Sequence, residues 1–144
     1  MPAASAGMTL ADVAALAAAS RHVEAIDREG RVWFGTWGAG LCVYDGEVWQ
    51  RLTRLDGLVH DVVQDLSEGP DGAIWIGTEG GGLNRLDRER KNFTRYLSRP
   101  GDPTSLSGND INALLQDNRG RIWVGTYGSG LDCLDPASGK YFHL

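Results

Sequence analysis

The sequence predicts an all-β fold made of three four-stranded antiparallel sheets, and three observations support this prediction. Glycine is frequent, at 20 of 144 residues, and is spread along the chain, as tight turns between strands require. One phrase built around a tryptophan occurs three times. Between these phrases, short runs of β-forming residues alternate with Gly, Asn, Asp and Pro, which favour turns.

The repeated phrase spans residues 30–45, 72–87 and 120–135 and reads G-x-[VI]-W-[FIV]-G-T-x-G-x-G-L, with an aspartate at its end. Its tryptophans are 42 and 48 residues apart. The longer interval contains the insertion "YLSRPGDPTSLSGND", which is expected in a connecting loop. We interpret the repeated tryptophans and the glycines two residues after them as structural anchors: Trp33, Trp75, Trp123, Gly35, Gly77 and Gly125.

The third unit shows its strands most clearly. We predict strands at 111–117, 121–126, 131–135 and 140–144. In the second of these, Trp123 and Gly125 share one face, whereas Ile122 and Val124 share the other. Both faces are largely apolar, as expected for a sheet stacked between two neighbouring sheets.

The other two units are interpreted in the same way. The second unit predicts strands at 60–67, 73–78, 83–87 and 92–97. The first unit is weaker, because Arg21 and His22 stand where the third unit has Ile111 and Asn112, so its innermost strand is expected to be short or frayed. Residues 1–15 form an Ala-rich segment that we expect to be helical or irregular.

Four-stranded units of about 40–50 residues with a recurring tryptophan fit the blades of a β-propeller. We therefore predict one incomplete domain, a partial β-propeller with blade 1 at 16–57, blade 2 at 58–105 and blade 3 at 106–144. Propellers close with roughly four to eight blades, so blades 1 and 3 would each leave one face open. Further blades of a longer chain, or copies of this chain, would cover these faces.

Composition excludes several classes. The chain has 19 acidic and 14 basic side chains, a net charge of -5, which argues against a nucleic-acid-binding surface. Cys42 and Cys133 lie far apart and outside any CxxC pair, so we expect small apolar strand residues, not a zinc site or a disulfide. The N-terminus lacks a basic region and Asp12 interrupts its apolar part, so neither a signal peptide nor a membrane segment is predicted.

Catalytic chemistry has little support in the sequence. The glycine phrases superficially suggest phosphate-binding loops, but a strand follows each one where a helix N-terminus would be needed, which favours turns. Asp27, Asp71 and Asp117 precede the tryptophan strands and are expected to cap turns, not to bind calcium. The histidines fall in different blades and no nucleophile has a recognisable context, so we predict no enzyme, metal or cofactor.

A ligand-binding face is predicted where residues vary inside the repeated frame. Each turn after a tryptophan strand begins with a different residue, and these turns share one end of the propeller with the connections that enter the next blade. The predicted ligand-binding residues are Trp37, Glu79 and Tyr127 from the turns, and His60, Asp61, Asn109 and Asp110 from the connections. Aromatic rings that stack on a sugar, with polar groups for its hydroxyls, would suit a glycan. The alternative is that the two aromatic residues only cover neighbouring blades.

The phrase G-x-[IV]-W-x-G-T-x-G-x-G-L and the connection "PGDPTSLSGNDINALLQDNRGRIWVGTYGSGL" resemble two-component regulator propeller repeats, over roughly residues 16–144. Only the first strand of blade 1 departs from the pattern. In that family the repeats form the extracytoplasmic sensor half of bacterial membrane proteins, whose cytoplasmic half is a histidine kinase, a hybrid kinase-regulator or a diguanylate cyclase, and many are associated with carbohydrate sensing.

The resemblance implies a non-catalytic sensor segment with a periplasmic or extracytoplasmic location and a small extracellular ligand such as a glycan. Two alternatives stay open. The chain could be a scaffold that completes a ring by self-assembly, or a propeller lyase or hydrolase, since propellers can host such chemistry.

Overall fold

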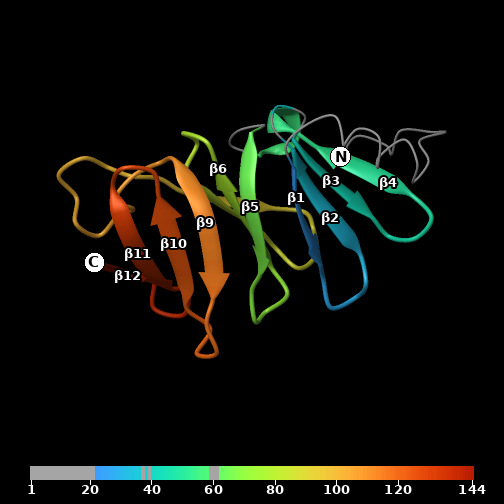
Figure 1. Cartoon of the computed structure of the whole chain (residues 1–144). Coiled ribbons are helices and arrows are strands. Elements are labelled where there is room, and N and C mark those ends of the chain that lie inside the picture. The colour runs from blue at the N-terminus through green and yellow to red at the C-terminus, as the bar shows by residue number, and fades with distance from the viewer. Residues whose placement is uncertain (1–21, 37, 39, 59–61) are drawn as a thin grey trace.

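The computed structural model describes residues 22–36, 38, 40–58 and 62–144, and its strands form three four-stranded antiparallel sheets, each a meander in chain order (Figure 1). Blade 1 contains β1 (His22–Ile26), β2 (Val32–Thr36), β3 (Leu41–Tyr44) and β4 (Trp49–Leu52), followed by the short helix η1 (Arg54–Asp56). Blade 2 contains β5 (Val63–Glu68), β6 (Ile74–Thr78), β7 (Leu83–Leu86) and β8 (Phe93–Tyr96). Blade 3 contains β9 (Ile111–Gln116), β10 (Ile122–Thr126), β11 (Gly130–Asp135) and β12 (Lys140–His143). The predicted all-β partial propeller of three blades is confirmed, while the predicted N-terminal segment lies outside the described residues.

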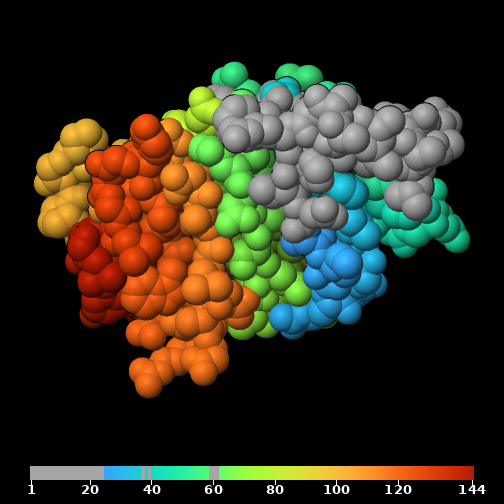
Figure 2. All heavy atoms as spheres, viewed as in Figure 1, coloured from blue at the N-terminus to red at the C-terminus, as the bar shows by residue number. Residues whose placement is uncertain are grey.

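The innermost strands of the three blades lie side by side. Strand β1 contacts β5, and β5 contacts β9, as Figure 1 shows. A side chain also joins two of them, because Asp65 Oδ2 of β5 accepts a hydrogen bond from the backbone N–H of Leu114 in β9 at 2.7 Å. Strands β4, β8 and β12 form the outer edges of the sheets. The space-filling view shows blade 3, in orange to red, at one end of the row (Figure 2).

Hydrophobic cores fill the two spaces between neighbouring blades. Trp33 of β2 packs with Val63 and Ile76 of blade 2, and Trp75 of β6 packs with Ile111 and Val124 of blade 3. Both tryptophans are only 1% exposed, so each contributes a large buried apolar area to the contact with the next blade. The third repeated tryptophan, Trp123, is partly exposed and lies on the outward face of blade 3.

Gly77 allows blade 3 to approach blade 2 closely. A Cβ atom at this position would lie 2.7 Å from Cγ2 of Ile111, so a larger residue would push the two blades apart. Gly125 holds the same position in β10, where a Cβ atom would first meet Ala113 Cβ of its own blade, at 3.3 Å. In blade 2 the repeated glycine therefore marks where the next blade's inner strand packs.

The glycine phrases form turns. In each blade the threonine that ends the tryptophan strand donates its hydroxyl to the carbonyl of the glycine four residues later, at 2.8 Å for Thr36 and Thr78 and at 2.7 Å for Thr126. The accepting glycine of blade 2, Gly82, has a φ of 78°, which other residues rarely adopt. A strand follows each turn, so these loops lack the helix N-terminus that a phosphate-binding loop uses.

The aspartates before the tryptophan strands cap their turns, as predicted. Asp27 Oδ1 accepts hydrogen bonds from the backbone N–H groups of Glu29 and Arg31, at 3.0 and 2.9 Å. Its Oδ2 accepts from Arg31 Nε at 2.8 Å and from the Trp33 indole at 2.9 Å. Asp117 has the corresponding four contacts in blade 3. The indole bond, which the sequence did not predict, ties Trp33 and Trp123 to the turns before their strands.

Blade 2 departs from this arrangement because Gly69 stands where blades 1 and 3 have an aspartate. A Cβ atom at Gly69 would lie 2.8 Å from Trp75 Nε1, so the packing leaves little room for a side chain there. Asp71 caps this turn instead, accepting from the backbone N–H of Ala73 at 3.1 Å. Asp71 also forms an ion pair with Arg85, whose guanidinium lies 6.0 Å from the centroid of the Trp75 ring.

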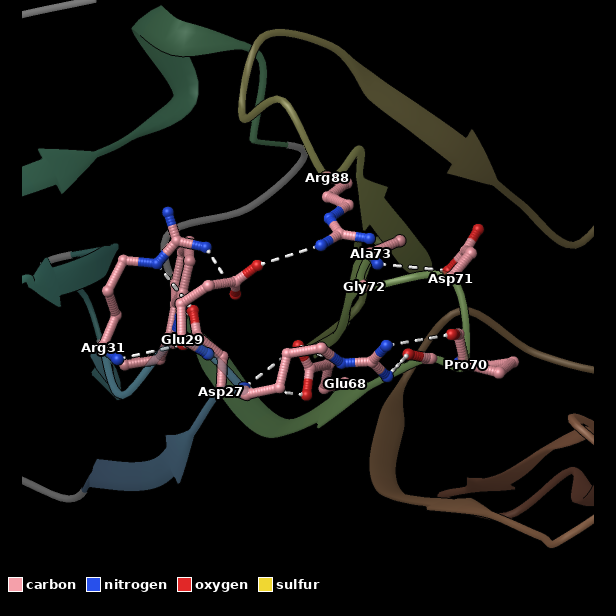
Figure 3. Close-up of polar contacts among 12 residues, drawn as sticks. Asp27, Glu29, Arg31, Glu68, Pro70, Asp71, Gly72, Ala73 and Arg88 are labelled. Carbon is pink, nitrogen blue, oxygen red and sulfur yellow. Dashed lines mark hydrogen bonds and ion pairs between the residues drawn. The ribbon is translucent and has the colours of Figure 1, made fainter.

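Polar contacts fasten the turn of blade 1 to blade 2, as Figure 3 shows around Glu68 and Pro70. Arg28 donates its backbone N–H to Glu68 Oε1 at 3.2 Å. Its guanidinium donates to the carbonyls of Gly69 and Pro70, at 3.2 and 3.3 Å. Between blades 2 and 3 the turns also approach closely, since a Cβ atom at Gly120 would lie 3.3 Å from Pro70 Cγ.

Arg90, in the turn between β7 and β8, also crosses from blade 2 to blade 1. Its guanidinium lies 4.9 Å from the centroid of the Trp33 ring and 3.5 Å from Asp27 Oδ2. It also donates to the carbonyl of Gly72 at 3.0 Å. Arg90 has a φ of 63°, a left-handed backbone conformation that costs about 1–3 kcal/mol in a residue other than glycine. This side chain therefore covers the tryptophan of one blade from the turn of the next.

Candidate functional site

The predicted ligand-binding residues that the structure describes lie at the end of the blades opposite the aspartate turns. Trp37, His60 and Asp61 lie outside the described residues. The structure places the other four, which are Glu79 in the turn after β6, Tyr127 in the turn after β10, and Asn109 and Asp110 in the connection from β8 to β9.

Backbone hydrogen bonds attach the turns that carry Glu79 and Tyr127 to the connections beside them. The Gly82 N–H donates to the carbonyl of Asn109 at 2.7 Å, and the Tyr127 N–H donates to the carbonyl of Asp110 at 2.8 Å. The Glu79 N–H donates to the carbonyl of Val62, just before β5, at 3.1 Å. The turns of blades 2 and 3 are therefore attached to the connections beside them, with residues 109 and 110 between the two turns.

The four side chains are not equally available to a ligand. Tyr127 is 75% exposed, and Glu79 is exposed as well. Asn109 Oδ1 accepts a hydrogen bond from the Ser98 N–H at 2.7 Å, and Asp110 Oδ1 accepts one from Gln64 Nε2 at 2.6 Å. Asn109 and Asp110 therefore hold the connection in place, while Glu79 and Tyr127 present a carboxylate and an aromatic ring to solvent.

The connection between blades 2 and 3 also carries a feature that the sequence did not predict. A hollow of about 400 Å³ lies here, lined by residues 98–103 and 105–107 and by His143 of β12. Beside Ser107, Asp132 of β11 is 0% exposed and accepts hydrogen bonds from the Ser107 N–H at 2.7 Å and its hydroxyl at 2.6 Å. The sequence offered one signal for this cluster, which is an aspartate inside the largely apolar run of β11. A buried carboxylate requires hydrogen-bonding or charged partners.

His143 completes this cluster. Its Nδ1 lies 2.6 Å from Asp132 Oδ1 and 2.9 Å from the Ser107 hydroxyl, and its Nε2 lies 2.8 Å from the carbonyl oxygen of Pro103. The pKa of His143 is raised above its ordinary value, because the hydrogen bonds to the Asp132 carboxylate and to the Pro103 carbonyl both favour the protonated ring.

The Ser107, His143 and Asp132 side chains do not form a hydrolytic triad. A triad needs the serine on one ring nitrogen and the carboxylate on the other, so that the ring can accept the serine proton while the acid orients it. Here Ser107 and Asp132 both approach Nδ1, and Nε2 faces a carbonyl oxygen. The cluster therefore lacks the arrangement for nucleophilic catalysis.

The described residues offer neither a metal-binding cluster nor a membrane-spanning helix. They contain no group of three or more His, Cys, Asp or Glu side chains placed to hold a metal ion. Over the same residues, no helix has the length and apolar character to span a membrane.

The comparison with protein families matches the repeats that build this face. A model described as "Two component regulator propeller" matches residues 57–80 and 105–128, which are equivalent parts of two successive repeats. These two segments match two-component regulator propeller repeats. Each matched segment runs through the inner strand and the tryptophan strand, and the two segments include Glu79, Asn109, Asp110 and Tyr127.

Solved structures with a similar architecture include an extracellular domain of a two component system and an enzyme. The extracellular domain of a hybrid two component system from B. thetaiotaomicron is 28% identical, with a TM-score of 0.74 over 84% of this chain. The propeller chain described here spans only 18% of that domain's length. Virginiamycin B lyase from Staphylococcus aureus, in a catalytically inactive form with quinupristin, has a TM-score of 0.63 at 13% identity over 85% of this chain and 40% of the lyase. That identity shows a shared fold alone. No curated protein sequence matches this chain.

Proposed function

We propose that the chain is a non-catalytic, ligand-sensing propeller segment of a bacterial two-component-type signalling protein, acting on the extracytoplasmic side of the membrane. The similarity to an extracellular domain of a hybrid two component system supports this role. The observation that carries the proposal is that Glu79 and Tyr127 are both exposed, on turns that are hydrogen-bonded to the connections beside them.

The ligand that best suits this face is a small glycan. Tyr127 offers an aromatic ring on which the apolar face of a sugar can stack, and Glu79 offers a carboxylate that can accept bonds from hydroxyl groups. On the basis of the sequence, the proposed site also includes Trp37, His60 and Asp61. It further includes Asn109 and Asp110, whose side-chain hydrogen bonds hold the connection between blades 2 and 3 in place.

Binding of a panel of oligosaccharides to the purified chain tests the proposal. We expect Trp37→Ala and Tyr127→Ala each to weaken binding about tenfold, the effect of losing one stacking contact of about 1.4 kcal/mol. Phe142→Ala is the matched control, because Phe142 is an aromatic residue of blade 3 that is 56% exposed but belongs to outer strand β12. Binding that survives both turn substitutions unchanged would reject this assignment of the site.

We also propose that a further propeller blade covers the outward face of blade 3. This face has an apolar hollow, and its lining includes Ala113, Leu115, Trp123, Gly125 and Leu131. The side chain of Leu115 is 66% exposed. The equivalent face of blade 2, with Trp75 and Gly77, is covered by blade 3 in this structure. The alternative is that copies of this chain cover the face and form a self-assembled scaffold.

Light scattering at increasing protein concentration distinguishes a missing blade from copies of this chain as the partner of blade 3. We expect the chain to associate without a defined size, and we expect Leu115→Glu to suppress this association by placing a charge on the apolar face. Leu55→Glu is the control, because Leu55 is 98% exposed and belongs to η1 of blade 1. A closed dimer that Leu115→Glu dissociates would support the scaffold instead, and a chain that stays monomeric at every concentration would contradict both.

A further inference from the structure

Asp132 is a buried carboxylate whose charge is balanced by a histidine. It is 0% exposed, and within residues 62–144 the salt bridge it makes is to His143, with the two atoms 2.6 Å apart. Its remaining hydrogen bonds come from the neutral N–H and hydroxyl of Ser107. Because a buried charge is costly without a counter-charge, the protonation state of His143 affects the free energy of this cluster.

The atoms around the imidazole ring require a proton on both of its nitrogens. Nδ1 lies against the Asp132 carboxylate, and Nε2 lies 2.8 Å from the carbonyl oxygen of Pro103. A carboxylate and a carbonyl oxygen only accept hydrogen bonds, whereas a neutral imidazole has one N–H and one lone pair. Loss of a proton would leave one of these acceptors facing a lone pair, and that contact would become repulsive.

The cluster joins two separate parts of the fold. Pro103 and Ser107 belong to the connection between blades 2 and 3, whereas Asp132 and His143 belong to β11 and β12. The same connection lines the hollow of about 400 Å³ and continues into Asn109 and Asp110. The ring of His143 therefore holds the connection onto the outer strands of blade 3.

We propose that His143 is a proton-operated clasp, which fastens residues 98–107 to β11 and β12 when its ring is protonated and releases them when the ring is neutral. The other charged or titratable groups near the ring are few. Tyr141 of β12 stacks with it at a centroid distance of 6.3 Å, and its phenol stays neutral because burial raises its pKa. From the connection, Arg99 and Asp102 line the same hollow and pair with each other at 3.0 Å.

The clasp is specific to blade 3. The strand register places Asp132 opposite His143 there, whereas it places Asn84 opposite Arg95 in blade 2 and Cys42 opposite Arg51 in blade 1. Neither of those pairs combines a carboxylate with a histidine. The response to pH should therefore be confined to the connection that enters blade 3.

The direction of the effect follows from the raised pKa of His143. A group whose pKa is higher in the folded protein stabilises the fold fully below its unfolded pKa, about 6.5 for histidine. That contribution is lost as the pH rises through the folded pKa. The clasp should be closed in mildly acidic solution and open in alkaline solution.

Urea unfolding of the full chain and the ¹H–¹⁵N signal of the Ser107 amide, followed from about pH 6 to about pH 9, test the clasp. We expect the unfolding constant to increase several-fold over this range and the Ser107 signal to shift with the same midpoint as the His143 ring. His143→Gln should remove both responses. The double variant Asp132→Asn/His143→Arg, which copies the Asn84 and Arg95 pair of blade 2, should fold and should also lack both responses.

His22→Gln and His60→Gln are the controls, since these are the other two histidines of the chain, and both variants should keep the wild-type response. If His143→Gln retains the wild-type pH dependence, or if the Ser107 signal of the wild-type chain does not change over the range, the proposal is wrong.

Discussion

Replacing Asp27 with alanine should lower the free energy of unfolding by about 3–5 kcal/mol, the usual effect of removing one partner from a buried ion pair. The Asp27 carboxylate is buried and accepts hydrogen bonds from Arg31 and from the Trp33 indole. It also lies 3.5 Å from the guanidinium of Arg90, which comes from blade 2. The alanine variant would leave an arginine and an indole N–H without their acceptor inside the interface between blades 1 and 2.

Asp117→Ala is the matched control for this prediction. Asp117 makes the same contacts to its own turn and tryptophan, but its side chain is partly exposed and Trp123 lies on the open face of blade 3. We therefore expect a smaller loss for Asp117→Ala in urea unfolding followed by tryptophan fluorescence. Equal losses for the two variants would show that the turn, and not the contact between blades, carries the effect.

The Asp27 carboxylate also predicts how stability depends on acid. Burial acts to raise its pKa, but hydrogen bonds from Trp33 and Arg31 outweigh burial and lower it below the ordinary value. A carboxyl group with a lowered folded pKa stabilises the fold above its unfolded pKa of about 3.9, and this contribution is lost as the pH falls through the folded value. Asp27→Asn should therefore be less sensitive to acid than the wild-type chain between about pH 4 and about pH 2.

The second large effect is expected for Gly82→Ala, with a loss of about 2–5 kcal/mol in the free energy of unfolding. Gly82 has a φ of 78°, and a Cβ atom there would lie 2.5 Å from the carbonyl oxygen of Tyr96 and 2.8 Å from Leu97 Cδ2. The variant would combine an unfavourable backbone conformation with a clash against the outer strand and the connection that follows it. Thermal or urea unfolding of the purified variant measures the loss.

Gly80→Ala separates these two contributions. Gly80 lies in the same turn with a φ of 79°, but a Cβ atom there would have no neighbour within 4 Å. Its substitution should cost only the conformational part, about 1–2 kcal/mol. If both variants lose the same stability, the close approach of Tyr96 to Gly82 contributes nothing.

The repeat could be recognised from the sequence because period and turn chemistry are local. The tryptophan phrase, the alternation in residues 121–126 and the Gly-rich turns each depend on residues close together in the chain, and together they predicted the strands and blades. The capping role of Asp27 and Asp117 was predictable for the same reason, since an Asx turn involves neighbouring residues.

The contacts between units could not be predicted in this way. Arg90 reaches Trp33 from the next blade, and nothing in the phrase around Arg90 indicates that partner. Asp132 meets Ser107 and His143 only because the strand register and the connection between blades bring them together. Within the proposed ligand face, the sequence located the exposed side chains of Glu79 and Tyr127, but not the structural hydrogen bonds of Asn109 and Asp110.

The two interfaces between blades are built on one repeated frame but closed by different chemistry. Contacts between blades 1 and 2 include Arg28 with Glu68 and Arg90 on Trp33. Contacts between blades 2 and 3 include Asp65 with Leu114 and Pro70 against Gly120. Exchanging the blades would separate Arg28 from Glu68 and Arg90 from Asp27. The repeats are therefore not interchangeable modules, because the contacts between neighbouring blades depend on residues that differ from one repeat to the next.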